Sequence, residues 1–463
     1  MLLERFRMQT EMMEAPDEPT KADASSEDMP ILEFSGTIDP VVDIPNEAEI
    51  LIYSKDQSYL THGIHRFPAK FFPELPRYLI EKYSDSRQVV LDPMCGSGTV
   101  ALEAMLMERL AVGIDIDPIA QLITRVKTTP IDPEILMLAS TWLIETIQER
   151  YLTAGYEPDI PRFNYQDNWF HSFVIKELAI IRSTISDLPN SPLGNAISSE
   201  EQVDITNFFK IIFSSIIRDV SNADPHCTRT VIRQNLQRSI LPGNTIGRFR
   251  ENLEKQIDSM IEFAKVCSQL QFKEVRLPQS RAEDTGLDSD SIALAVTSPP
   301  YINAVDYPRT HQLEMYWLGL AGDEPLSKMK REYIGTETVY KKEYRSLRVS
   351  GLSALDPLLE AIFDKDPRRS FIVFKFFCDM KMQLQEMIRV LRPGARYCLA
   401  IGNNVIRGVP IPSQEVLGEL ATSDEVGFEL EKIFFSGLIR HFIKIPRKER
   451  MRGEWVLILR KPQ

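Results

Sequence analysis

The chain has 463 residues, of which 43% are hydrophobic and 26% charged, and such a chain can bury the core of two or three folding units. No apolar run approaches the roughly 18 residues that cross a bilayer, and the N-terminus lacks the pattern of a secretory signal. We therefore expect a cytoplasmic protein with no membrane role. The formal net charge of −12 argues at first against a nucleic-acid partner.

The acidity is concentrated near the N-terminus. Residues 1–50 hold 13 acidic and three basic residues, which leaves 53 acids and 51 bases in the remainder. Residues 1–49 are rich in Glu, Asp, Ser, Pro and Met and show no sustained period, so they are predicted to form a disordered acidic tail. The near-neutral body can then still carry a basic face.

The body alternates strand-like and helix-like patterns, with one interruption. Residues 50–129 include RQVVLDPMCGSGTVALEAMLMERLAVGID, which predicts a strand, a glycine loop, a helix and a second strand. Residues 130–275 change to long amphipathic helices, which we interpret as a helical insertion. Residues 276–463 return to the alternation, with the strand SIALAVT, a helix at Cys378–Leu391, an RPG turn, the strand ARYCLAIGNN and a C-terminal antiparallel hairpin closing the sheet. The sequence thus predicts an α/β, Rossmann-like mixed sheet with a large helical insertion.

The first chemical motif is the loop DPMCGSGT, which directly follows a predicted strand and precedes a helix. Gly96 and Gly98 allow the backbone to turn tightly and approach a ligand. The loop lacks the G-K-[ST] of a phosphate loop, so it favours a nucleotide-like cofactor without a triphosphate. A glycine pair alone is also compatible with a plain turn.

A carboxylate follows the next predicted strand, in GIDIDP. Asp115 lies where open α/β sheets commonly bind the ribose hydroxyls of an adenosine group. The alternative is that Asp115 and Asp117 only cap the following helix, which suits Asp117 better than Asp115.

The third motif is Ser298-Pro299-Pro300-Tyr301, after the apolar stretch AVT. Two prolines donate no backbone hydrogen bonds and keep the chain extended, which leaves nearby carbonyls and the serine hydroxyl as acceptors. Acceptors suit an amine substrate, and Tyr301 can stack on a base. The alternative is a rigid turn with a surface tyrosine.

Together these motifs resemble the amino-methylating (cytosine-N4 or adenine-N6) DNA methyltransferases, in which a similar glycine loop occurs with [SDN]-PP-[YFW]. The resemblance covers roughly residues 60–129 and 280–460, including HGIHRFPAKFFPELPRYLI before the glycine loop. It implies a class I methyltransferase fold and S-adenosylmethionine as cofactor. The SPPY form implies transfer to the N4 amine of cytosine in double-stranded DNA, with the target base flipped out; adenine N6 is the alternative.

The resemblance also implies residue roles, which we take as expectations. The cofactor is expected to contact Phe67, Lys70, Asp92, Gly96, Gly98 and Asp115, with Asp92 near its methionine portion. For the cofactor adenine, Arg281, Glu283 and Asp284 compete, and we choose Asp284. Ser298, Pro299, Pro300 and Tyr301 would surround the target base, and Asn303, Asp306 and Tyr307 would contact the substrate, although a loop-stabilising role fits the last three nearly as well.

The helical insertion separates Gly98 from Ser298 by 200 positions and is a candidate target-recognition domain. Basic groups there and later in the chain could neutralise phosphates or read guanine, and each run is equally compatible with a solvated surface: His226, Arg229, Arg233 and Arg238; Lys328, Lys330 and Arg331; Lys341, Lys342, Arg345 and Arg348; and residues 440–452. A restriction-modification role with a cognate endonuclease is a further expectation from the resemblance.

Two rival functions remain open. DPMCGSGT also resembles the loop of RNA guanine-N2 methyltransferases, and a non-catalytic DNA-binding relative is conceivable, although intact motifs argue against it. Cytosine C5 methylation would need a nucleophilic cysteine, usually after proline, and none of the five cysteines has that context or the spacing of a metal site.

Overall fold

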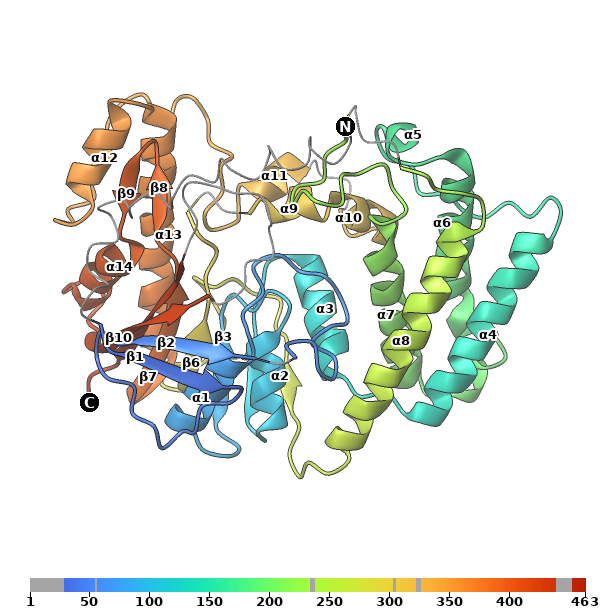
Figure 1. Cartoon of the computed structure of the whole chain (residues 1–463), viewed down its shortest axis with the longest axis horizontal. Coiled ribbons are helices and arrows are strands. Elements are labelled where there is room, and N and C mark those ends of the chain that lie inside the picture. The colour runs from blue at the N-terminus through green and yellow to red at the C-terminus, as the bar shows by residue number, and fades with distance from the viewer. Residues whose placement is uncertain (1–28, 55, 234–237, 303–304, 322–325, 439–451) are drawn as a thin grey trace, which may run out of the picture.

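The computed structural model describes residues 29–54, 56–233, 238–302, 305–321, 326–438 and 452–463 (Figure 1). Among these residues nine strands form one sheet, in the order β1 (Ile31–Ser35), β2 (Glu49–Tyr53), β10 (Glu429–Gly437), β11 (Gly453–Arg460), β7 (Leu391–Ile401), β6 (Ile292–Thr297), β3 (Val89–Asp92), β4 (Leu110–Gly113) and β5 (Val275–Arg276). β11 is antiparallel to both its neighbours, and every other adjacent pair is parallel. The predicted Rossmann-like α/β fold is confirmed.

Helices cover both faces of the sheet, so its strands are apolar on both sides. On β6, Leu294 and Val296 pack toward α1 (Glu74–Tyr83) and α2 (Thr99–Leu106), whereas Ala295 faces the opposite layer. That layer consists of α12 (Asp356–Phe363), α13 (Pro367–Val390) and α14 (Ser413–Thr422). The alternation follows from the two-residue period of a strand. It holds the parallel strands at fixed register and brings their carboxyl ends to one edge.

A separate helical body lies beside α3 (Pro118–Thr128) (Figure 1). It contains α4 (Pro133–Leu152), α5 (Gln166–Trp169), α6 (Ser172–Asp187), α7 (Ser199–Ile217) and α8 (Asn244–Cys267). α7 begins with a capping box in which Ser198 and Glu201 bind each other's backbone amides, an arrangement that satisfies two amides at the helix start. These helices occupy the interval in which the sequence predicts an insertion.

The chain after β6 joins the helical body to the sheet. It forms α9 (Tyr307–Thr310), α10 (Gln312–Leu318) and α11 (Leu326–Lys330). Trp317 of α10 is completely buried, and its indole meets the rings of Phe163, Phe170 and Phe213 edge-on. Trp317 is thus a core residue. A small two-stranded sheet, β8 (Asn404–Ile406) with β9 (Val409–Ile411), completes the described elements.

The structure contradicts part of the predicted disordered tail. Residues 1–28 lie outside the described residues, but β1 and β2 are strands of the main sheet, and Ile38, Ile44 and Ala48 between them are buried. β2 pairs with β10, a strand almost 400 positions later in the chain, and this pairing holds β2 in the sheet. A local composition rule cannot detect such pairing.

The C-terminal hairpin also differs from expectation. β10 and β11 pair as predicted, but they do not close the sheet, because β10 continues onto β2 and β1. The RPG turn is not a separate turn either. It forms part of β7, where a register shift against β6 absorbs the irregular backbone and Gly394 has φ +76°.

None of the helices in the described ranges combines the length and apolarity needed to cross a bilayer.

The ordered part of the N-terminal segment generates a stability prediction. Ile50 of β2 is fully buried, whereas Val41 in the same segment is 86% exposed. Replacing Ile50→Ala removes core contacts and should lower the free energy of unfolding by about 2–4 kcal/mol in a denaturant titration. Val41→Ala is the control and should change it by less than about 0.5 kcal/mol. Equal effects of the two substitutions would contradict the fold described for residues 29–54.

Candidate active site

Three parallel strands end at the same edge of the sheet and bring the predicted motifs together. The glycine loop follows β3, Asp115 follows β4, and Ser298 follows β6. The Thr297 hydroxyl donates to Asp92 Oδ1 at 2.7 Å, and the Gly96 amide donates to Asp115 Oδ2 at 2.8 Å. Ligands of open α/β sheets bind outside the carboxyl ends of the strands, and this is where the motifs meet.

The two loop glycines have different structural roles. Gly96 lines the cavity at this edge, and a Cβ there would lie 3.2 Å from the Phe67 ring. Gly98 has φ +75°, and a Cβ there would come within 2.6 Å of Thr124 on α3. Gly98 is therefore required for the loop to pack on α3. It does not line the cavity, in contrast to the cofactor contact expected from the sequence.

Three carboxylates gather beneath the loop, of which Asp92 and Asp117 are buried and Asp115 is partly exposed to the cavity. Burial raises the pKa of Asp92 to about 7 and that of Asp115 to about 6. Burial, followed by repulsion from Asp115, raises the pKa of Asp117 to about 7. Asp117 caps α3 by accepting from the Ile119 amide at 2.9 Å, as expected from the sequence, whereas Asp115 accepts from the backbone around the cavity. Desolvation disfavours the charged forms, so a ligand that offers hydroxyl or ammonium groups here would be bound strongly.

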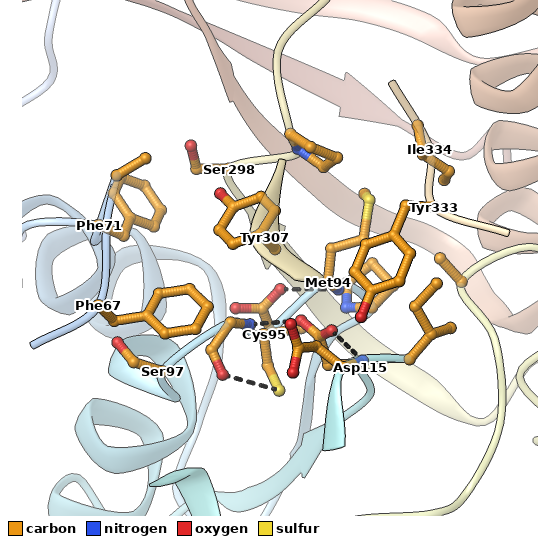
Figure 2. Close-up of a pocket in the computed structure, with 18 of the residues that line it drawn as sticks. Phe67, Phe71, Met94, Cys95, Ser97, Asp115, Ser298, Tyr307, Tyr333 and Ile334 are labelled. Atoms are coloured by element: carbon orange, nitrogen blue, oxygen red, sulfur yellow. Dashed lines mark hydrogen bonds between the residues drawn. The ribbon is translucent and has the colours of Figure 1, made fainter. Parts of the chain in front are cut away.

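The cavity beside these carboxylates has an empty volume of about 860 Å³, including its open mouth (Figure 2). Figure 2 shows Phe67, Tyr307 and Ser298 around the same space, with Asp115 below them. The wall is completed by Lys70, Phe71, Met94, Ile116, Glu283, Pro300, Tyr333 and Ile334. Acceptors for ribose hydroxyls and for an ammonium group, combined with aromatic and aliphatic walls, fit S-adenosylmethionine.

The segment before α1 contributes one wall. The Phe67 ring stacks on the rings of Tyr307, with centroids 5.4 Å apart, and of His311, at 5.3 Å. Lys70 lines the cavity, but its ammonium donates to the carbonyls of Gln57 and His62, and burial lowers its pKa to about 8. Phe67 therefore lies where the sequence expected it, while Lys70 holds the backbone of its own segment.

Asp284 is a wrong choice for the cofactor adenine. Its side chain is exposed and lies outside the cavity wall, whereas Glu283 lines the cavity and accepts from Arg281 Nε at 2.6 Å. Residues 281 and 284 form a tight turn closed by a β-bridge, so neighbouring side chains point to different sides. Of the three competing residues, Glu283 is the one in position.

Only some of the residues predicted to contact the substrate line the cavity. Asn303 lies outside the described residues. Asp306 caps α9 and pairs with Lys330 at 2.9 Å, so it stabilises its loop and does not line the main cavity. Tyr307 does line that cavity. Ser298 and Pro300 also line it, whereas Pro299 and Tyr301 do not, and the Tyr301 hydroxyl donates to Glu454 of β11.

Several of the expected DNA-contacting arginines are occupied within the protein. Arg238 donates to the carbonyls of Arg218, Asp219, Ser221 and Ala223, which fixes a loop after α7. Arg233 pairs with Asp224 at 2.7 Å, and Arg229 lies 3.7 Å from Glu337. Lys341, Lys342, Arg345 and Arg348 are exposed, and residues 440–451 of the last predicted basic run lie outside the described residues.

A buried ionic cluster was not predicted from the sequence. Glu103 of α2 is fully buried; it accepts from His62 Nε2 at 2.7 Å and Arg77 Nε at 2.8 Å, and Tyr59 also donates to it. Burial lowers the pKa of His62 to about 4, so the histidine is a neutral donor. Although burial opposes ionisation of Glu103, these partners lower its pKa below the usual value. The lone acid in the apolar helix TVALEAML was the available signal.

Glu103 anchors the segment that carries Phe67, because its partners flank that segment. Glu103→Gln should leave the half-buried Arg77 without its counter-ion and lower the free energy of unfolding by about 1–3 kcal/mol, with weaker cofactor binding. Calorimetric titration and denaturant unfolding measure the two effects. The exposed Glu81→Gln on α1 is the control and should change neither; an unchanged cofactor affinity in Glu103→Gln would refute the anchoring role.

The raised pKa of Asp92 predicts a pH-dependent stability. Because the folded carboxyl titrates near pH 7 and an unfolded one near 3.9, ionisation opposes folding as pH rises between these values. Asp92→Asn in the cofactor-free protein should therefore be more stable than the natural protein by about 1–3 kcal/mol at pH 8. The difference should shrink below pH 7 and approach zero near pH 4 in thermal unfolding, and the exposed Asp288→Asn should show none of it. A pH-independent difference would contradict the burial described for Asp92.

Comparison with known proteins agrees with this geometry. Residues 44–125 match the family described as DNA methylase (N6_N4_Mtase). The type II methyltransferase M.MvaI of Kocuria varians is 24% identical over 78% of this chain and 81% of its own length, and M.BsoBI of Geobacillus stearothermophilus is 22% identical over 83% and 82%. M.MjaII of Methanocaldococcus jannaschii is 35% identical over 82 residues, 18% of this chain and 16% of its own.

Among solved structures, a SAM-dependent methyltransferase from Methanosarcina mazei covers 83% of this chain and 96% of its own, with 11% identity and a TM-score of 0.29, and an overlap that weak supports no conclusion. The sequence matches confirm the resemblance drawn from the motifs, with S-adenosylmethionine as the cofactor that it implies. Residues 44–125 thus match the amino-methylating DNA methylase family, and most of the chain is similar in sequence to type II methyltransferases.

Proposed function

We propose that the protein transfers a methyl group from S-adenosylmethionine to the exocyclic N4 amine of cytosine in DNA. The observation that carries this proposal is the position of Ser298 and Pro300 on the wall of the cavity that also contains Asp92, Gly96 and Asp115. A side chain suited to accept from an amine, that of Ser298, therefore lies beside carboxylates suited to bind a methyl donor, and this supports the proposal.

The bound cofactor would supply an electrophilic methyl group, and the residues of the protein would hold the cofactor and the target amine in the orientation needed for transfer. Asp115, with both oxygens already oriented by the Gly96 and Asp117 amides, is suited to the ribose hydroxyls. Asp92, held by Thr297, is suited to the ammonium of the methionine portion. Phe67 and Tyr307 pack on each other at the wall and restrict water there. Correct placement of the reacting groups is the main contribution that such residues make to rate.

Ser298 is the residue proposed to orient the target amine. An exocyclic amine is a weak nucleophile because its lone pair is conjugated with the ring. The Ser298 hydroxyl and a carbonyl beside Pro299 can accept its two protons, which directs the lone pair toward the methyl group. The amine of a paired base is inaccessible, so the base must leave the duplex at a cost of a few kcal/mol.

The choice of cytosine rests on the SPPY form of the motif, and adenine N6 is the alternative. DNA is favoured over RNA by the type II methyltransferase relatives, which also support a place in a restriction-modification system with a cognate endonuclease. Activity on DNA in turn fits the cytoplasmic location expected from the sequence.

The test is methyl transfer by purified protein to unmethylated DNA, with the nucleosides then identified by mass spectrometry. We expect N4-methylcytosine, and Ser298→Ala should lower its rate of formation at least about tenfold with the cofactor affinity retained. Ser186→Ala, on the exposed face of α6, should match the natural protein. N6-methyladenine would correct the base and keep the enzyme, whereas methylated RNA with unmethylated DNA would overturn the proposal.

A further inference from the structure

A second cavity adjoins the cofactor cavity on the far side of Phe71. It has an empty volume of about 470 Å³, including open solvent, and Phe71 lines both cavities. Its walls combine flat apolar groups, Phe71 and Phe72, with the polar side chains of Gln57, Ser436 and Glu454. Flat apolar walls with a few polar groups are suited to a planar heterocycle.

The SPPY motif connects the two cavities. Ser298 and Pro300 line the cofactor cavity, whereas the Tyr301 hydroxyl donates to Glu454 Oε1 at the wall of the second. Glu454 is the second residue of β11 and lies directly opposite Ser436 of β10, and the pairing of β11 with β7 begins at the next residue, Trp455. A planar group in the second cavity would lie next to Tyr301 and near Ser298, where the methyl group is transferred.

We propose that Glu454 is a substrate-contacting residue that recognises the flipped target base in this second cavity. The inference rests on the proposed function and adds a residue to it. One carboxyl oxygen of Glu454 accepts from Tyr301, and the part of the chain that the structure describes gives the other oxygen no hydrogen bond, so it can accept from the polar edge of the base.

Burial supports a recognition role for this carboxyl group. Burial raises the pKa of Glu454, because desolvation disfavours its charged form, so a donor that satisfies the carboxyl oxygens here would be bound strongly. Cytosine and adenine both present an amine donor beside a ring-nitrogen acceptor. The second oxygen of the Glu454 carboxylate can accept from that amine, whereas a glutamine whose oxygen accepts from Tyr301 would present only a donor.

Another cavity is less suited to the base. It lies around Asp306 and Lys330, which pair with each other inside it, and no residue of the SPPY motif lines it. A base seated there would have to compete with an existing ion pair, and it would lie on the Tyr333 side of the cofactor cavity.

The kinetic test uses the full-length enzyme and DNA containing its methylation site. Glu454→Gln keeps the size of the side chain and an acceptor for Tyr301, but it cannot present a carboxyl group to the base. We expect kcat/KM for DNA to fall at least about tenfold, with the affinity for S-adenosylmethionine and the Tm unchanged. Glu429→Gln, an exposed carboxyl of the same hairpin, is the control and should match the natural enzyme. Natural kcat/KM in Glu454→Gln would overturn the proposal.

A structural readout locates the base independently of activity. The target base is replaced by a photoreactive analogue, 5-iodocytosine or 8-bromoadenine according to which base is methylated, and the cross-linked peptide is identified by mass spectrometry. Cross-links to Phe71 or Phe72 support the proposal, and cross-links within residues 305–338 overturn it. If the natural enzyme methylates no DNA, the proposed function itself fails. If it methylates DNA while Glu454→Gln is fully active, only the role of Glu454 fails.

Discussion

The hydrogen bond between Thr297 and Asp92 joins residues 205 positions apart, and the site depends on the strand pairing that brings these two residues together. It forms because β3 and β6 are adjacent parallel strands that end at the same edge of the sheet. The glycine loop and the SPPY motif are thereby brought to one cavity, with the helical body inserted between them in sequence. That body packs against α3 and α10, beside the sheet, and leaves the edge itself open.

The cavity is lined by three carboxylates whose ionisation is disfavoured by burial. Asp92, Asp115 and Asp117 are kept together although burial raises the pKa of each, and such an arrangement is destabilising until cationic or hydroxyl groups compensate for it. Behind the loop, Glu103 is the opposite case, because its partners lower its pKa despite burial. The protein therefore combines carboxylates that face the cavity, whose pKa values are raised, with a buried structural carboxylate whose pKa is lowered by its partners.

The parts of the site predicted from the sequence are those that follow an apolar strand directly. Gly96, Asp115 and Ser298 each occur within a few residues of a strand end, so local pattern and the rules of open sheets suffice to bring them together. Glu454 and Glu103 could not be placed in this way, since their partners Tyr301, His62 and Arg77 are distant in sequence. The distinction between Glu283 and Asp284 depends on one tight turn, whose side-chain directions no periodicity reveals.

The fold class could be predicted from the sequence, but the strands β1 and β2 at one edge of the sheet could not. Hydrophobic alternation predicted β3, β4, β6 and β11. It did not predict β1 and β2, which lie in an acidic segment and join the sheet through the pairing of β2 with the distant strand β10. The role of Arg238 could not be predicted from the sequence either, because it depends on which backbone carbonyls lie within its reach in the folded loop.

The most direct measurement of methyl transfer by this site is single-molecule sequencing of genomic DNA from a methylation-deficient bacterial host that expresses the protein. We predict N4-methylcytosine at nearly every copy of one short sequence, and unmodified DNA in cells that express Ser298→Ala at the same level. Unmodified DNA in both strains, from a natural protein that binds S-adenosylmethionine, would contradict the assignment of Ser298 and its cavity to DNA methylation.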